Sequence, residues 1–213
     1  PHFVSDEAYI LSSCSAAAIL AENVRERVPK VDSLRMLLGA FSMIDEYLSA
    51  GFPDVDRANN REAYFACLAF LDSLPYFKEY KLKSYELLQL GQGMTVLEAG
   101  CGLGDDAFRI AGRIMPGGRV TALDSSVVMI EKARSRNDAM RLPVDFERGD
   151  VRALPFPDNA FSRCRIDRVL QHIPEPQRAV CELVRVLEPQ GLMLAYDNDW
   201  GTFSVTSADQ ETT

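Results

Sequence analysis

The sequence predicts an α/β protein with a Rossmann-like, doubly wound and mainly parallel sheet behind a helical N-terminal cap. Three observations predict this fold. Strand-length apolar runs alternate with stretches of helical spacing from about residue 84 onward, the first run ends in closely spaced glycines, and acidic residues follow three runs. Such alternation implies parallel strands joined by right-handed crossovers. We expect strands near 94–99, 119–124, 143–148, 161–166 and 191–198, and helices near 104–115, 126–138 and 176–188.

The first 80 residues have a different pattern, in which apolar side chains recur at helical spacing. Leu37, Phe41 and Leu48 are an example. Prolines separate such stretches, at Pro29 and Pro75 among other positions. We therefore predict helices over 8–28, 33–50 and 60–74, and a chain divided into a helical cap of residues 1–80 and a cofactor-binding core of residues 81–213.

Composition limits the partners and the compartment. The chain has 213 residues, of which 47% are hydrophobic, and its 23 Lys and Arg against 31 Asp and Glu give a net charge of −8. It lacks the basic stripe of proteins that track a phosphate backbone, so we expect no nucleic-acid partner. No apolar run approaches the roughly 18 residues of a membrane span. The five cysteines are widely spaced without a C-x-x-C pair, so we expect a reduced cytoplasmic protein without a metal site.

Residues 96–106 carry the strongest functional signal. A short apolar run passes through Glu98 into Gly100, Gly102 and Gly104. This pattern indicates a buried strand that turns sharply into a helix. Glycine tolerates positive φ and lets a ligand lie against bare backbone, and the amides at the start of the helix can hold an anion. The stretch predicts a small-molecule site at the carboxyl end of a strand.

The glycine spacing alone fits two ligand classes. The segment from Gly102 to Ala107 satisfies the dinucleotide pattern G-x-G-x-x-A, which keeps an NAD(P)-dependent oxidoreductase open. Asp124, twenty positions after the last of these glycines, is placed to grip a ribose diol in either class. Glu98, Asp124 and Asp150 then end three successive strands. So much negative charge suits a ligand with amines and a sulfonium better than a pyrophosphate.

Several spaced motifs over roughly residues 80–200 match a known family. They are Glu98-x-Gly100-x-Gly102-x-Gly104, Asp124, Gly149-Asp150-Val151, and the segments 154–161, 168–176 and 182–196. In these motifs the sequence resembles the class I S-adenosylmethionine-dependent methyltransferases, and within them the small-molecule branch typified by ubiquinone- and menaquinone-biosynthesis methyltransferases. The resemblance implies S-adenosyl-L-methionine as cofactor, S-adenosyl-L-homocysteine as product, and in-line methyl transfer to an O, N or C nucleophile of a small-molecule metabolite.

The resemblance also implies roles for the residues at the strand ends. The glycines would pack against the methionyl part, Glu98 would orient its amino group, and Asp124 would take the ribose hydroxyls. Asp150 would accept from the adenine amine, while Arg168 would neutralise the methionyl carboxylate or form an ion pair with a neighbouring acid. The cofactor-binding set implied in this way is Glu98, Gly100, Cys101, Gly102, Gly104, Asp124, Ser125, Gly149, Asp150, Val151, Asp167 and Arg168.

Two side chains near the ends of the last two strands are candidates for chemistry on the acceptor. His172, one of only two histidines, is a candidate general base for a hydroxyl acceptor, with a structural role in its loop as the alternative. Asp199, beside Trp200, is expected to orient the substrate. Together with Asp197 it makes only a weak metal site. The segment 167–170 lacks the Asn/Asp-Pro-Pro-aromatic clamp of nucleic-acid amino-methyltransferases, so we expect a small-molecule acceptor.

The pattern departs from the family at the C-terminal side. The family core has seven strands, the last two forming an antiparallel edge hairpin, whereas the strand pattern here stops after the fifth. We therefore expect an incomplete core, and a non-catalytic methyltransferase-like partner subunit stays open beside the oxidoreductase alternative. The N-terminal helices are expected to cap the substrate pocket, to supply a homodimer contact, or to cover one face of the sheet.

Overall fold

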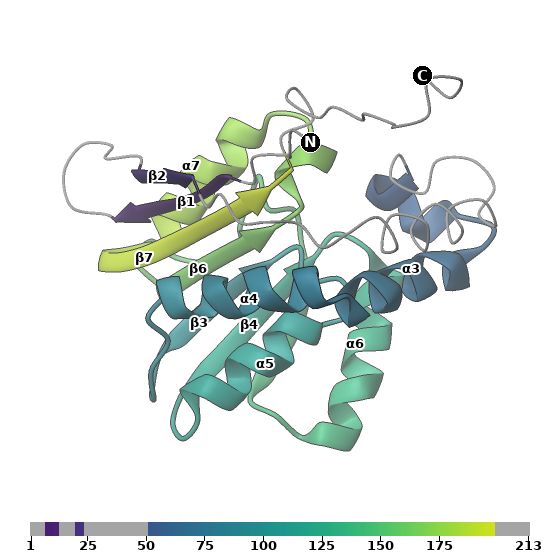
Figure 1. Ribbon diagram of the computed structural model, residues 1–213, viewed down its shortest axis with the longest axis horizontal. Coiled ribbons are helices and arrows are strands. Elements are labelled where there is room, and N and C mark those ends of the chain that lie inside the picture. The colour runs from purple at the N-terminus through teal and green to yellow at the C-terminus, as the bar shows by residue number, and fades with distance from the viewer. Residues whose placement is uncertain (1–6, 13–19, 24–50, 199–213) are drawn as a thin grey trace, which may run out of the picture.

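A seven-stranded sheet in the order β2-β1-β7-β6-β3-β4-β5 forms the centre of the protein. The computed structural model describes residues 7–12, 20–23 and 51–198 (Figure 1). Five neighbouring strands, β7 to β5 in this order, are parallel. All five were predicted, although β7 begins four residues earlier than expected. Their bounds are β3 Thr95–Ala99, β4 Arg119–Asp124, β5 Val144–Arg148, β6 Phe161–Asp167 and β7 Leu187–Asp197.

An N-terminal hairpin completes the sheet beside β7 (Figure 1). β1 (Glu7–Ser12) pairs antiparallel with β7 over its whole length, and β2 (Leu20–Asn23) pairs antiparallel with β1. The helix expected over 8–28 is therefore wrong. The free edge of β7 offers unpaired N–H and C=O groups, and pairing with it outweighs the helical spacing of the apolar residues.

The hairpin changes two further expectations. An antiparallel pair of strands lies at the edge that we expected to stay empty for lack of C-terminal strands, so the described sheet reaches seven strands. Residues 1–80 are also not helical throughout, because β1 and β2 join the sheet of the core. The helix expected over 33–50 lies outside the described residues, and the division of the chain at residue 80 stays a prediction.

The segment before β3 contains one expected and one unexpected helix. The 3₁₀ turn η1 (Phe52–Arg57) precedes α3 (Arg61–Ser73), which confirms the helix predicted over 60–74. The second helix, α4 (Pro75–Leu87), was missed because Pro75 was interpreted only as a break. Proline fits the first turn of a helix, where its missing N–H has no partner to lose.

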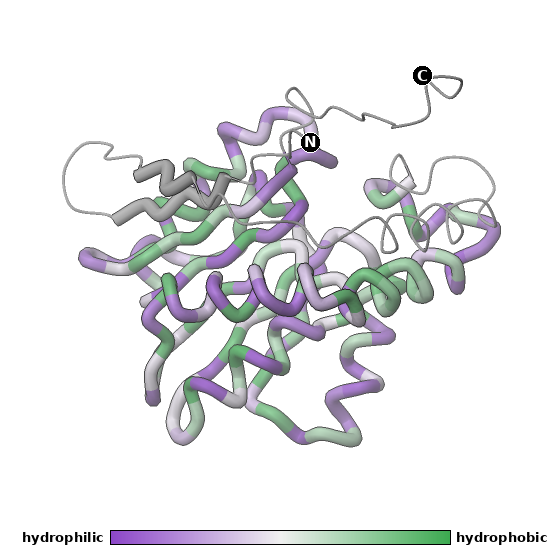
Figure 2. The backbone as a smooth tube through the Cα atoms, in the orientation of Figure 1, coloured by the Kyte–Doolittle hydropathy of each residue, from purple (hydrophilic) through white to green (hydrophobic). Residues whose placement is uncertain are grey.

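Helices cover both faces of the sheet. Residues of α4, α5 (Asp105–Ile114) and α6 (Val127–Met140) pack with β3, β4 and β5 in one apolar cluster. On the opposite face, α7 (Pro176–Val186) packs with β6 and β7 in a second cluster. Figure 2 shows hydrophobic positions along the central strands and mixed polarity along the helices, as expected for helices with one buried side. Within the described residues no helix has the length and apolar character needed to span a bilayer.

Candidate cofactor site

The loop after β3 is built around glycines in the left-handed region. Gly100, Gly102 and Gly104 have φ values of 74°, 51° and 83°. A Cβ at Gly100 would lie 2.1 Å from a methyl carbon of Val169, and one at Gly104 would lie 2.8 Å from the Phe146 ring. Gly100 and Gly104 are therefore required both for conformation and for space.

Backbone hydrogen bonds tie this glycine loop to the end of β4. The amides of Gly100 and Cys101 both donate to the Leu123 carbonyl, at 2.7 and 3.0 Å. The Gly102 amide donates to Oδ2 of Asp124 at 2.8 Å. The turn from β3 into α5 is thus held in one arrangement by its neighbour in the sheet, which is the preorganisation that a ligand lying on the loop requires.

Asp124 lies at the centre of these contacts. Its Oδ1 accepts from the Ser126 amide at 2.9 Å, while Oδ2 accepts from the glycine loop. Burial raises the pKa of Asp124, and the bonds from backbone amides oppose that shift. Each carboxylate oxygen keeps a further lone pair that can accept from a hydroxyl. The exposed Ser125 lies next to it in the chain.

The residues after β5 extend the same edge of the sheet. The Gly149 amide donates to the Asp124 carbonyl at 2.9 Å, and Val151 is buried. Asp150 is exposed and forms a two-pronged ion pair with Arg152, with nitrogen-to-oxygen distances of 3.0 and 2.7 Å. This pairing is the main cause that lowers the pKa of Asp150. Asp150 is therefore already paired with a cation of the protein.

Glu98 belongs to a buried ion cluster, defined here as Glu98, Asp106, Asp167, Lys81 and Arg165. Arg165 is 0% exposed and donates to Glu98 Oε1 at 2.5 Å and to Asp167 Oδ2 at 2.8 Å. Asp106 lies 3.4 Å from Arg165 and 2.5 Å from the ammonium of Lys81. Sequence reasoning placed Glu98 and Asp167 at the site and missed Arg165, although an arginine two residues before Asp167 in a predicted strand was a signal for it.

Within the buried ion cluster, the pKa values of Glu98 and Asp106 are shifted in opposite directions. Burial raises the pKa of Glu98 against the attraction of Arg165, and the neighbouring carboxylates raise it further. For Asp106, the attraction of Arg165 and Lys81 outweighs burial and lowers the pKa. The hydroxyl of Tyr80 donates to both oxygens of Asp167. Glu98 therefore holds a proton more easily than Asp106 does.

Arg168 follows β6 with a φ of 56°, and its amide donates to the Tyr196 carbonyl at 2.7 Å. Its guanidinium lies over the Phe77 ring, 4.9 Å from the centroid. Its Nε is 3.6 Å from Asp167 Oδ1, which is an ion pair at a length too great for a hydrogen bond. The alternative role of Arg168, an ion pair with a neighbouring acid, is thus formed with Asp167, and it leaves the Nε donor without a hydrogen bond among the described residues.

His172 ends the short 3₁₀ turn η2 (Leu170–His172). Its ring centroid lies 5.8 Å from that of Phe52, and its Nε2 lies 3.2 Å from Nε2 of Gln171. Burial lowers the pKa of His172, and the charge of Arg168 lowers it further. The lowered pKa favours the neutral imidazole at pH 7. Asp199 and Trp200 lie outside the described residues.

Asp197, considered from the sequence only as half of a metal pair, supports the loop that carries His172. Its Oδ2 accepts from the Leu170 amide at 2.8 Å, and its buried Oδ1 has no hydrogen-bond partner among the described residues. Burial raises the pKa of Asp197 to about 6. Across the described part of the chain, no group of three His, Cys, Asp or Glu side chains is arranged to hold a metal ion.

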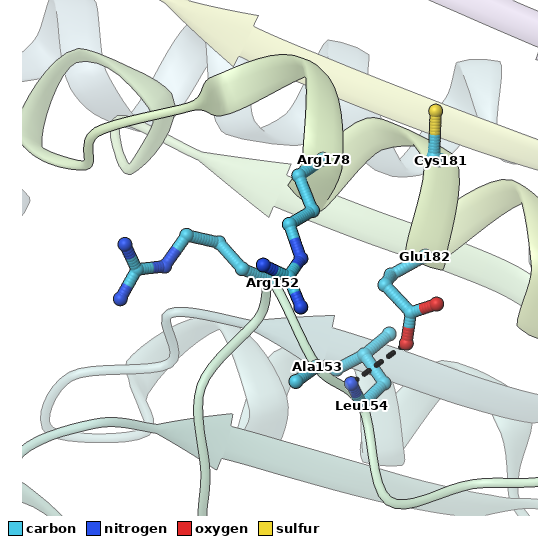
Figure 3. A pocket seen from close by; sticks show the side chains of 6 residues that line it. All are labelled: Arg152, Ala153, Leu154, Arg178, Cys181 and Glu182. Atoms are coloured by element: carbon cyan, nitrogen blue, oxygen red, sulfur yellow. Dashed lines mark hydrogen bonds between the residues drawn. The ribbon is translucent and has the colours of Figure 1, made fainter.

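A separate hollow of about 300 Å³ lies on the α7 side of the sheet (Figure 3). Its wall is closed by a bond of 2.8 Å from the Leu154 amide to the Glu182 carboxylate. Arg152 and the α7 side chains Arg178 and Cys181 also line it. The hollow borders the segment after Asp150 and does not include the glycine loop.

Residues 96–191 match the model of a family described as a methyltransferase domain. Over this segment the chain is similar to the methyltransferase domains of class I S-adenosylmethionine-dependent enzymes. It is 28% identical over 144 residues to the demethylmenaquinone methyltransferase of Desulfitobacterium hafniense, covering 67% of this chain and 57% of the relative. With that of Listeria welshimeri it shares 32% over 120 residues, covering 56% and 51%. This chain thus spans about half the length of these curated relatives.

Solved structures share the fold of this methyltransferase domain. The [4+2]-cyclase SpnF is 31% identical with a TM-score of 0.54, covering 57% of this chain and 45% of SpnF. A methyltransferase from Aquifex aeolicus, described as SAM-dependent, has a TM-score of 0.56 over 79% of this chain and 81% of its own, at 20% identity, and so supports the fold alone.

The residues of the methyltransferase domain fit its cofactor, S-adenosylmethionine. Two buried atoms near the ends of β3 and β6 lack hydrogen-bond partners among the described residues: the acceptor Glu98 Oε2 and the donor Arg168 Nε. An acceptor and a cationic donor are what the amino and carboxylate groups of an amino acid require. Asp124 supplies acceptors for ribose hydroxyls beside the glycine loop, from which it accepts the Gly102 amide.

Proposed function

We propose that this chain binds S-adenosylmethionine across the ends of β3, β4 and β5 and transfers its methyl group to an O, N or C nucleophile of a small molecule. The observation that carries the proposal is Asp124, held by the amides of Gly102 and Ser126 beside a loop in which side chains at positions 100 and 104 would clash. The similarity to demethylmenaquinone methyltransferases supports a small-molecule acceptor.

Each part of the cofactor has a proposed partner. Glu98 Oε2 accepts from the amino group, and Arg168 pairs with the carboxylate. Asp124 takes the ribose hydroxyls. Asp150, with the Val151 amide, receives the adenine edge, and Asp150 does so while still paired with Arg152. Because Asp150 is exposed and already paired, we expect it to contribute less binding free energy than Asp124.

The protein contributes to the reaction by positioning the acceptor against the methyl group and by accepting the acceptor's proton. The bound cofactor supplies an electrophilic methyl group on a sulfonium. Holding a nucleophile in line with such a group is worth about 7–11 kcal/mol in favourable cases. His172, in the neutral form that its lowered pKa favours, accepts the proton of a hydroxyl acceptor, and Asp199 orients the substrate. Cofactor and acceptor then meet where the loop after β6 carries Arg168 and His172.

The fold does not by itself fix the reaction. SpnF, which shares the fold, is described as a [4+2]-cyclase. A non-catalytic partner subunit also stays open, as does an oxidoreductase that uses the pattern from Gly102 to Ala107. A homodimer through the N-terminal helices and a cytoplasmic location remain predictions.

Calorimetric titration with S-adenosylhomocysteine and, separately, with NAD(H) tests the cofactor. We expect micromolar binding of the homocysteine product and none of NAD(H). Asp124→Ala should weaken binding about 100-fold, because it removes a charged acceptor of several hydrogen bonds. The control is Asp145→Ala, which changes a half-exposed aspartate paired with Arg119. Binding of NAD(H) in place of the homocysteine product would overturn the proposal.

A screen of phenols, amines and quinol precursors with methyl-labelled cofactor then tests the acceptor. If the acceptor is a hydroxyl, His172→Gln should slow transfer by about 10²–10⁴-fold, the usual range for a lost general base. A cofactor-loaded protein that labels none of these compounds would support the non-catalytic alternative.

A further inference from the structure

A single carboxylate from the N-terminal segment caps helix α6. Asp56, on η1, accepts from the Ser126 hydroxyl at 2.5 Å and from the amides of Val127 and Val128 at 3.0 and 3.2 Å. Burial opposes ionisation of Asp56, but these three bonds outweigh it and lower the pKa of the side chain. Asp56 is therefore an anion at the positive end of α6, bonded across 70 residues of sequence.

This cap is connected to the candidate cofactor site through one residue. Ser126 donates its hydroxyl to Asp56 and its amide to Oδ1 of Asp124. The other oxygen of Asp124 accepts from the Gly102 amide. A chain of direct hydrogen bonds therefore runs from η1 to the carboxylate proposed to hold the ribose and on to the glycine loop.

The apolar side chains of η1 lie over the same site. Val55 is 1% exposed and packs in one cluster with Leu103 of the glycine loop and Met129 in the first turn of α6. At the other end of η1, the Phe52 ring lies 5.8 Å from His172. The segment therefore extends from the start of α6 to the loop after β6, and α3 continues it above α6 (Figure 1).

We propose that η1 covers the ribose end of the cofactor site and that Asp56 acts as its latch. The hydrogen bonds of Asp56 must break before the cofactor leaves, and the rate at which they break sets the rate of release. The proposal rests on the proposed function for the identity of the cofactor. η1 has six residues, of which Val55 is buried and Phe52 is partly buried in the same apolar cluster, so its opening exposes the apolar surface of these two side chains. The hydrogen bonds of Asp56 are the polar contacts that must break with them.

The variant that isolates the latch is Asp56→Asn, which keeps the size of the side chain and one acceptor oxygen but removes its charge. Loss of a helix cap of this kind should speed release of S-adenosylhomocysteine about tenfold. Ser126→Ala, which removes only the hydroxyl link, should give a smaller increase in the same direction. Asp54→Asn is the matched control, because Asp54 is exposed on the same turn and its ion pair among the described residues is with Arg57 of that turn.

Two measurements decide the proposal. Hydrogen exchange in the ligand-free protein should show faster exchange at the Val127 and Val128 amides in Asp56→Asn than in wild type or Asp54→Asn. Surface plasmon resonance should show the faster release of S-adenosylhomocysteine in the same variant.

The outcomes separate the latch from the cofactor. Unchanged exchange at both amides would show that Asp56 does not hold α6, which overturns the proposal. Faster exchange with unchanged release would show that η1 does not cover the ligand, which also overturns it while leaving the proposed function intact. A wild-type protein that binds no S-adenosylhomocysteine would instead overturn the proposed function, and the latch with it.

Discussion

The two ends of the candidate cofactor site hold their carboxylates in opposite ways. At the nucleoside end, Asp124 is bonded by backbone amides, and Asp150 is exposed beside Arg152. At the methionyl end, Glu98 and Asp167 share the fully buried Arg165. Acids that end successive strands therefore do different work. One end uses the backbone as its scaffold, and the other uses charges that depend on each other.

The methionyl end has a charge balance that suits a zwitterion. When Glu98 is ionised, the three acids of the buried ion cluster face two cations, and Arg168 adds a third cation 3.6 Å from Asp167. An added single charge would upset this balance, and burial would make the imbalance costly. An amino acid group brings one charge of each sign, so it can bond to Glu98 and Arg168 without changing the net charge.

The largest expected effect is the loss of stability caused by a substitution at the methionyl end. Arg165→Met leaves Glu98, Asp106 and Asp167 buried without their shared cation, and should lower the free energy of unfolding by about 3–5 kcal/mol. Urea denaturation followed by circular dichroism measures this. Arg152→Met, the corresponding change at the nucleoside end, removes an exposed ion pair and should leave stability within error. Equal losses of unfolding free energy in Arg165→Met and Arg152→Met would contradict the different roles of charge at the two ends of the site.

The sequence predicted the central strands because their apolar runs are local signals. It failed where the structure depends on distant partners. The stretch 8–28 has helical spacing, yet β1 forms because β7 offers an edge. The strand-end positions of Glu98, Asp124 and Asp150 followed from the motif, but their different environments did not. Asp56 was missed for the same reason, because its contact with α6 spans 70 residues.

A smaller effect concerns the pH dependence of stability. Burial raises the pKa of Glu98 in the folded protein above its unfolded value of 4.5. The folded state therefore holds this proton more tightly, and the stability that it contributes is lost as pH rises through the folded pKa. Glu98→Gln cannot lose the proton, so its stability relative to wild type should increase with pH above about 4.5.

Urea midpoints measured between pH 4 and pH 9 check this sign. The control is Glu131→Gln on the exposed side of α6, which should give a profile parallel to that of wild type. A Glu98→Gln protein whose stability relative to wild type falls with rising pH would mean that Arg165 dominates and that Glu98 is ionised throughout. The methionyl end would then have no acid that readily holds a proton.

The smallest effect concerns His172, which lies where the two ends meet the acceptor. Burial and the charge of Arg168 lower its pKa below the usual 6.5. The protein has two histidines, so proton NMR resolves the titration of each, and His172→Gln identifies the signal. Arg168→Met should raise the pKa of His172, because it removes a nearby positive charge that disfavours the imidazolium. Arg178→Met, on the exposed side of α7, should leave the pKa of His172 unchanged.

A His172 pKa at or above 6.5, or one that does not respond to Arg168→Met, would mean that the imidazole is not kept neutral by the methionyl end. In that case the same cation could not both bind the cofactor carboxylate and keep the neighbouring base free to accept a proton.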